Sequence, residues 1–127
     1  MVIRTDFSDQ EAWEAIGAAI LQLTKEGFGA QVEFLDDVAY HGATREQLLS
    51  LVREGEERPF FLLIVDPVTV RAPEHPVLVV DLWREPGRQF RAVPAAVQSI
   101  ENNLSIANMD FAEFADAVDK NGIFRGF

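Results

Sequence analysis

Hydrophobic residues recur after Ser8 with the spacing of a helix. The apolar positions in this segment are separated by three or four residues: Trp13, Ile16, Ile20 and Leu23. This spacing places them on one face of a helix, with the polar residues elsewhere. Ser8 and Glu11 have the spacing of a capping box, which predicts that the helix starts at Asp9. Gly27 predicts its end, near Lys25, because glycine readily takes the left-handed conformation that closes a helix.

Short apolar segments predict a sheet. We expect five strands, over residues 2–6, 30–37, 60–66, 77–83 and 89–93. The segments FFLLIVD and VLVVDLW are continuously apolar, which is typical of strands covered on both faces, so these two are expected at the centre of the sheet. Pro86 and Gly87 predict a turn between the last two strands, which therefore form an antiparallel hairpin.

Three more helices are indicated by residues that suit helix starts. Two begin with a capping-box pair, Thr44 with Gln47 and Asp110 with Glu113. Pro94 suits the first turn of the other helix. The apolar residues expected on the buried faces are Leu48, Leu49, Val52, Val97, Ile100, Leu104, Phe111, Phe114, Ala115 and Val118.

The end of the sequence is expected to complete the core. Gly122 is placed to cap the last helix, and Ile123, Phe124 and Phe127 are predicted to be buried after it. Together the elements predict a single α/β domain over residues 1–127, with α+β as the alternative. Its mixed sheet has five strands and about four helices, in the order β-α-β-α-β-β-β-α-α.

Composition is that of an ordinary globular domain. The 127 residues are 48% hydrophobic, enough to bury one core. The first residues are charged and no apolar run approaches the length of a membrane span, so we expect a soluble protein without a leader. The absence of Cys excludes disulfides and thiolate chemistry and fits a reducing compartment. We therefore expect the cytoplasm.

Charge is the one unusual compositional feature. There are 21 acidic and 11 basic side chains, a net charge of −10. Nucleic acids and anionic membranes are bound through clusters of Lys and Arg, which the sequence lacks, so neither is an expected partner. A basic protein, a cation or a polar small molecule remains open as a partner, and the charge also serves solubility.

Aspartates follow several predicted strands. Because the carboxyl ends of parallel strands meet at one edge of a sheet, Asp6, Asp37 and Asp66 are candidate ligands for Mg²⁺. The link from Asp66 to Val77 is too short for a parallel crossover, which places Asp81 at the opposite edge. Asp is also common in the turn after a strand, since its carboxylate accepts hydrogen bonds from nearby backbone N–H groups. Both interpretations stay open.

The other candidate catalytic residues lack the partner residues that a catalytic motif requires. His41 and His75 lie in predicted loops, where either is a possible general base, but no nucleophile motif accompanies them. No glycine-rich phosphate loop is present. We therefore assign no catalytic residue and predict no cofactor.

Four motifs carry a resemblance to a known family. RTDFSD, HPVLVVDL, FR…VP and NLSIANMDF…FRGF occur in this order. With them, the sequence resembles, over nearly its whole length, a family of small bacterial proteins described as a domain of unknown function. The resemblance implies a free-standing cytosolic bacterial domain. It implies no activity, cofactor or catalytic residue.

These observations favour a binding role over catalysis. The first hypothesis is a protein-binding module, similar to an immunity protein or an inhibitor, that meets a basic partner. The acidic residues proposed for this contact are Asp36, Asp37, Glu54, Glu56 and Glu57. The alternatives are a homo-oligomeric structural or ligand-sensing module, and a magnesium-dependent enzyme that uses Asp6, Asp37 and Asp66.

Overall fold

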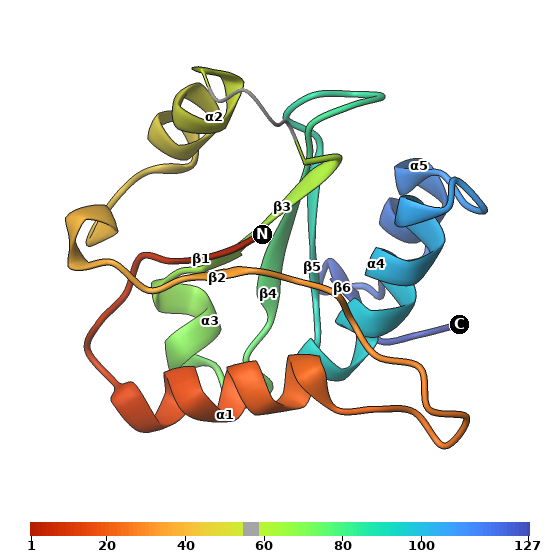
Figure 1. Cartoon of the computed structure of the whole chain (residues 1–127), viewed down its shortest axis with the longest axis horizontal. Coiled ribbons are helices and arrows are strands. Elements are labelled where there is room, and N and C mark those ends of the chain that lie inside the picture. Colours follow the sequence, from red (N-terminus) through yellow and green to blue (C-terminus); the bar gives the residue numbers. More distant parts are fainter. Residues whose placement is uncertain (55–58) are drawn as a thin grey trace.

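A mixed sheet lies at the centre of the computed structural model, which describes residues 1–54 and 59–127 (Figure 1). Its strands are β1 (Val2–Arg4), β2 (Phe34–Leu35), β3 (Phe61–Val65), β4 (Val77–Asp81), β5 (Gln89–Ala92) and β6 (Ile123–Phe124). The α-helices are α1 (Gln10–Leu21), α2 (Arg45–Glu54), α3 (Pro67–Arg71), α4 (Val97–Ser105) and α5 (Phe111–Ala115). Two 3-10 turns are η1 (Val38–Tyr40) and η2 (Pro94–Ala96). Within the described ranges, no helix is both long and apolar enough to cross a membrane.

The strand order is β2-β1-β3-β4-β5-β6, and the sheet combines parallel and antiparallel pairs. β1 pairs in parallel with both β2 and β3. β4 is antiparallel to β3 and to β5, and β6 runs parallel to β5 at the edge. Residues 66–76, between β3 and β4, contain only the short α3, so the chain turns back instead of crossing over.

Different helices cover the two faces of the sheet (Figure 1). In β3, Leu63 and Val65 belong to a core formed with α1, α4 and α5. Leu62 and Ile64 belong to a second core on the opposite face, with Leu48 of α2. This alternation explains why β3 and β4 read as continuously apolar, since every residue of both strands is buried.

The connections between the parallel strands β1, β2 and β3 run over both faces of the sheet. The chain passes from β1 to β2 over the face of α1, and from β2 to β3 over the face of α2. The loops after β1 and β3 both lead to the face of α1, since Val70 of α3 belongs to the same core as α1. In open α/β sheets, ligands usually bind outside the carboxyl ends of the strands.

The predicted fold class is confirmed as mixed α/β, with differences in number. In the part of the chain that the structure describes there are six strands and five α-helices, where five and about four were expected. The additional elements are β6 and α3, which are too short to produce a periodic pattern. β2 is limited to Phe34–Leu35 within the predicted 30–37. The β4–β5 hairpin and the central position of β3 and β4 are confirmed.

Two of the three capping-box predictions are confirmed, including the pair that starts α5. At the start of α2, Thr44 N donates to the Gln47 side-chain oxygen at 2.8 Å, and Gln47 N donates to the Thr44 hydroxyl at 3.1 Å. At α1 the prediction of Ser8 as the cap is wrong. Asp9 caps this helix by accepting from Ala12 N at 3.0 Å, because its carboxylate reaches the orphan N–H groups of the first turn.

α1 is also shorter than predicted. It ends at Leu21 rather than near Lys25, and Leu23 is exposed. A turn replaces the expected last helical residues, since Phe28 N donates to the Thr24 hydroxyl at 3.0 Å and Thr24 N donates to the Phe28 carbonyl at 2.8 Å. The Thr24 side chain thus competes with the helix for a backbone donor.

The last helix ends earlier than predicted as well. α5 ends at Ala115, and Gly122, with φ of +77°, lies in the turn that leads into β6. The Asp119 carboxylate shapes this turn by accepting from Asn121 N at 2.8 Å and from Ile123 N at 3.1 Å. Tertiary pairing with β5 then makes the following residues a strand.

The two Phe residues of the C-terminal segment have different environments. Phe124 is fully buried, with its ring edge-on to Phe114 at 5.3 Å between centroids. Phe127 is 78% exposed, so the prediction that it closes the core is wrong. Its ring lies on the outside of the other two, 5.5 Å from Phe114 and 5.1 Å from Phe124.

We expect Phe124→Ala to lower the free energy of unfolding by about 3–5 kcal/mol, because it leaves a cavity in a close-packed aromatic cluster. Phe127→Ala is the matched control and should cost less than about 1 kcal/mol, since an exposed ring loses little contact area. Urea denaturation of both variants measures the difference. Equal losses would mean that the C-terminal segment packs differently.

Candidate functional site

The carboxylates of Asp6 and Asp37, predicted to bind a metal, accept hydrogen bonds from backbone N–H groups two residues further along the chain. Asp6 accepts from Ser8 N at 2.8 Å, and hydrogen bonding with Ser8 lowers the pKa of Asp6 although burial opposes this shift. Asp37 caps η1 by accepting from Ala39 N at 2.9 Å. Among the residues that the structure describes, no three His, Cys, Asp or Glu side chains are placed to hold a metal ion together. The contacts of Asp6 and Asp37 are those expected of aspartates that stabilise a turn by accepting hydrogen bonds from nearby backbone N–H groups.

Arg4 is a buried cation at the end of β1, with only 4% of its side chain exposed. It donates to Asp36 at 3.1 Å and to the Gln10 side-chain oxygen at 2.9 Å. Its guanidinium lies 4.5 Å from the ring centroid of Phe7 and 5.1 Å from that of Trp13. Asp36, which the sequence offered as a contact for a basic partner, therefore balances an internal charge and joins the β2 end to β1.

Asp66 forms a two-point ion pair with Arg91 of β5. The two carboxylate oxygens accept from the guanidinium at 3.0 and 2.8 Å. Asp66 also caps α3 by accepting from Thr69 N at 3.0 Å. Burial by itself raises the pKa of Asp66, but the hydrogen bonds from Arg91 and Thr69 outweigh burial and hold the pKa below its ordinary value. This network closes the edge of the sheet where a ligand was expected.

The other sequence candidates are spread over the molecule. The β3–β4 register places Asp81 opposite Phe61, which confirms that Asp81 lies at the far end of the sheet from Asp66. The His41 ring lies edge-on to another ring at 5.8 Å, and the Nδ1 atom of His75 is 2.9 Å from the Thr69 carbonyl oxygen. The side chain of Glu54, and both Glu56 and Glu57, lie outside the described residues.

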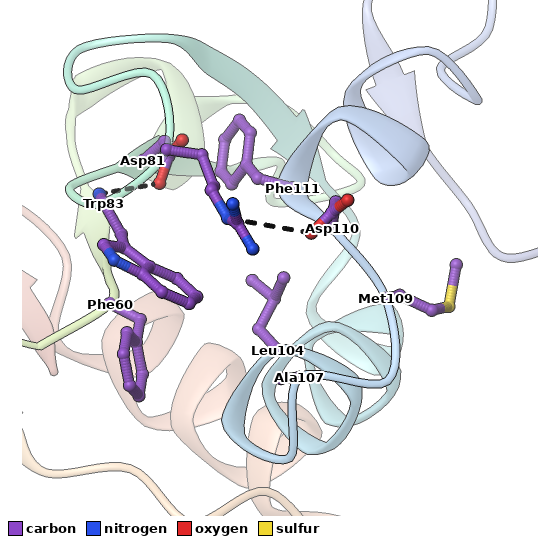
Figure 2. A pocket seen from close by; sticks show the side chains of 9 residues that line it. Phe60, Asp81, Trp83, Leu104, Ala107, Met109, Asp110 and Phe111 are labelled. Atoms are coloured by element: carbon purple, nitrogen blue, oxygen red, sulfur yellow. Dashed lines mark hydrogen bonds and ion pairs between the residues drawn. The ribbon is translucent and has the colours of Figure 1, made fainter.

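An exposed aromatic pair lies at the far end of the sheet, beside the β4–β5 turn (Figure 2). Phe60 precedes β3 and Trp83 follows β4, so the antiparallel pairing brings them together, and Leu82 N donates to the Phe60 carbonyl at 3.0 Å. The two rings are 5.0 Å apart between centroids. Phe60 is 46% exposed and Trp83 is 51% exposed. Two large rings in mutual contact thus remain open to solvent.

The aromatic pair is the rim of a small recess that reaches to the ends of α4 and α5. We call this region the Trp83 surface; it consists of Phe60, Asp81, Trp83, Arg84, Leu104, Ala107, Met109, Asp110 and Phe111. The recess has a volume of about 20 Å³. Sites for metabolites usually enclose several hundred Å³. The recess is therefore too small for a whole small molecule.

A buried carboxylate holds the turn that carries Trp83. The Asp81 side chain accepts from Trp83 N at 2.9 Å and from Glu85 N at 2.8 Å. Its own carbonyl accepts from Gly87 N at 2.9 Å. These hydrogen bonds fix the backbone of the turn, so the Trp83 ring is carried by a rigid loop.

Ala107, on the recess, has an uncommon backbone conformation, with φ of +54°. It follows α4 in a Schellman arrangement, in which Ala107 N donates to the Leu104 carbonyl at 3.1 Å and Asn108 N donates to the Asn103 carbonyl at 3.0 Å. Glycine is the usual residue at this position, because a Cβ atom is unfavourable there. The chain instead keeps a methyl group that lines the recess.

Two larger and more open hollows lie elsewhere. One, of about 400 Å³, lies between residues 27–31 and the end of α4, and contains the Glu101 carboxylate. This carboxylate already accepts hydrogen bonds from Gln31 N and Ser105. The other, of about 390 Å³, lies between residues 39–43 and α2, beside His41. Neither hollow brings several charged side chains together.

The sequence interpretation missed the Trp83 surface. Trp83 was assigned to the end of a buried strand, and β4 in fact ends at Asp81. The available signal was a Trp directly before the turn residues REPGR, since a large aromatic in a turn has no neighbouring strand to cover it. The recess itself needs residues from α4 and α5, which local patterns do not connect.

The fold and this surface define a small single-domain α/β protein that exposes an aromatic recess at one end of its sheet. The chain belongs to the family described as a domain of unknown function (DUF6924), whose model matches residues 1–127. No curated protein matches the chain.

We expect Asp66→Asn to lower the free energy of unfolding at neutral pH by about 1–3 kcal/mol, because Arg91 loses its ionised partner while half-buried. Asn retains an oxygen for Thr69 N, so the change isolates the ion pair. The folded-state pKa of Asp66 is lowered, so its contribution is present above the unfolded pKa of about 3.9 and is lost as pH falls. Urea denaturation of both proteins from neutral to acid pH should show the gap closing. A gap that stays constant with pH contradicts the assignment.

Ala107→Gly should raise the free energy of unfolding by about 0.5–1 kcal/mol, since relief of the left-handed strain exceeds the added entropy of the unfolded chain. Ala72→Gly is the matched control: with φ of −73°, it relieves no such strain and should destabilise by about 0.5–1 kcal/mol. Thermal and urea denaturation measure both. A loss of stability in Ala107→Gly would mean that its methyl contacts outweigh the strain.

Proposed function

We propose that the chain is a protein-binding module, of the immunity-protein or inhibitor kind, that meets a positively charged partner through the Trp83 surface. The observation that carries this proposal is the half-exposed Phe60–Trp83 pair on a rigid turn. Trp and Arg are enriched among the residues that dominate binding energy at protein interfaces, and such residues sit beside small, well-packed recesses.

The size of the recess favours a macromolecular partner. A volume of about 20 Å³ accepts one side-chain tip, and most of the contact would then come from the surrounding rim. Exposed aromatic rings in mutual contact cost solubility, so the Phe60–Trp83 pair is best explained by contact with another protein. Ala107 adds support, because backbone strain often persists where it serves a site.

Charge supports a basic partner. With a net charge of −10, the domain attracts cationic proteins over distances beyond direct contact and so accelerates their association. Asp36 and Asp37, first suggested as the contact residues, act within the fold, through Arg4 and η1. In the revised proposal the overall charge steers the partner, and the aromatic rings hold it.

The alternatives from the sequence have less in their support. A magnesium-dependent enzyme would need Asp6, Asp37 and Asp66 as shared ligands, and each is already hydrogen-bonded within the described chain. A ligand-sensing module could use the hollow beside His41, but that hollow has no set of charged groups that would define a ligand. Self-association through the Trp83 surface is an outcome of the test below.

We expect Trp83→Ala to weaken binding of the partner at least about 30-fold, the loss of a typical interface hot spot of about 2 kcal/mol. The protein, immobilised, is exposed to a lysate of its native organism, and captured proteins are identified and their affinity measured. A basic protein whose on-rate falls with salt and whose binding depends on Trp83 supports the proposal.

The matched control is Phe127→Ala, which removes an exposed aromatic ring outside the Trp83 surface. It should retain the partner. Sedimentation of the wild type and Trp83→Ala tests self-association in parallel. A captured protein that binds Trp83→Ala as tightly as Phe127→Ala would overturn the proposal. A wild-type dimer that Trp83→Ala converts to a monomer would overturn it as well.

A further inference from the structure

Arg84 occupies a defined position on the Trp83 surface. Its guanidinium carbon lies 4.5 Å from the centroid of the Trp83 ring, within the range of a cation–π contact. The Arg84 Nε atom is 3.9 Å from the Asp110 Oδ1 atom at the start of α5. Figure 2 marks this ion pair with a dashed line to Asp110. An aromatic face and a carboxylate therefore converge on one positive charge.

This arrangement is the geometry by which proteins recognise a cationic side chain. The face of Trp is the most favourable aromatic surface for a guanidinium or ammonium group. A carboxylate beside it adds charge-assisted hydrogen bonding. Phe60 packs against Trp83, with 5.0 Å between the ring centroids, and restricts the movement of its ring.

Arg84 is held only loosely in this position. Its side chain is 60% exposed, and that of Asp110 is 65% exposed. A separation of 3.9 Å is too long for a hydrogen bond, and exposed ion pairs contribute little to stability. Nearby Arg88 differs, since it donates to Glu85 and Asp116 at 2.7 Å each. Arg84 can thus leave its position at small cost.

We infer that Trp83, Phe60 and Asp110 form a binding site for an arginine or lysine side chain of the partner, and that Arg84 fills this site in the free protein. This inference rests on the proposed function and names the chemistry that the Trp83 surface recognises. The incoming side chain displaces Arg84 into solvent and takes its place between the indole and the carboxylate.

The negative charge of the domain favours a positively charged side chain as the occupant of the site. The domain carries a net charge of −10, so a basic segment is drawn toward it before contact. When Arg84 moves away, the site loses one positive charge and presents the Asp110 carboxylate to the partner.

The test uses a fluorescent six-residue arginine peptide as the probe and a citrulline peptide of the same length as its neutral isostere, with binding followed by anisotropy at low ionic strength. Arg84→Gln removes the internal competitor and should bind the arginine peptide about two- to fivefold more tightly than wild type. Trp83→Ala and Asp110→Asn should each weaken binding by a similar factor. The citrulline peptide should bind none of the proteins measurably.

Arg88→Gln is the matched control, because it removes the same charge from the same turn but lies outside the cation site. Tighter binding by Arg84→Gln than by Arg88→Gln supports displacement, and equal gains would show a general charge effect and overturn it. Equal binding of the arginine and citrulline peptides, or no binding of the arginine peptide by Arg84→Gln, would also overturn the inference. Circular dichroism checks that each variant is folded.

The failure of this inference is distinguishable from that of the proposed function. If Trp83→Ala still captures the native partner, the Trp83 surface is not the contact and the proposed function fails. If Trp83→Ala loses the partner while Arg84→Gln gains nothing over Arg88→Gln, the contact stands and the cationic side-chain site fails.

Discussion

The short connection between β3 and β4 is the constraint on which the rest of the structure depends. Residues 66–76 cannot carry the chain back to the starting edge of the sheet, so β4 must run antiparallel to β3. The parallel, doubly wound half therefore stops at β3, and the antiparallel pairs β3–β4 and β4–β5 follow it. This one reversal decides which side chains meet at each end of the sheet.

At one end, the reversal brings opposite charges together. β5 runs in the same direction as β3, two positions away in the sheet, so Arg91 can reach across β4 to Asp66. Arg4 and Asp36 pair beside them. The edge at which many α/β proteins bind a ligand is here closed by internal ion pairs. Its charged residues serve the cohesion of the fold.

At the other end, the same reversal leaves apolar surface open. Phe60 and Trp83 flank the antiparallel pair β3–β4, so their rings meet where no helix covers them. Asp81, buried under the turn, fixes the backbone that presents Trp83. Ala107 keeps a strained conformation on the same recess. Rigidity, exposure and strain thus coincide at this end of the sheet.

The sequence by itself determined the features that depend on neighbouring residues. The apolar runs of β3 and β4, the caps of α2 and α5 and the turn after β4 follow from local spacing and local hydrogen bonds. The length of one link was enough to separate Asp66 from Asp81. These features are predictable because a few adjacent residues decide their energy.

Only the tertiary structure decided which distant residues meet. The pairs Arg4–Asp36, Asp66–Arg91 and Phe60–Trp83, and the recess beside Ala107, join segments that share no local pattern. The early ends of α1 and α5 likewise follow from a side-chain bond at Thr24 and from the pairing of β6 with β5. Strand order and register set these contacts, and both depend on how the whole core packs, which is why neither the ion pairs nor the Trp83 surface could be found from spacing alone.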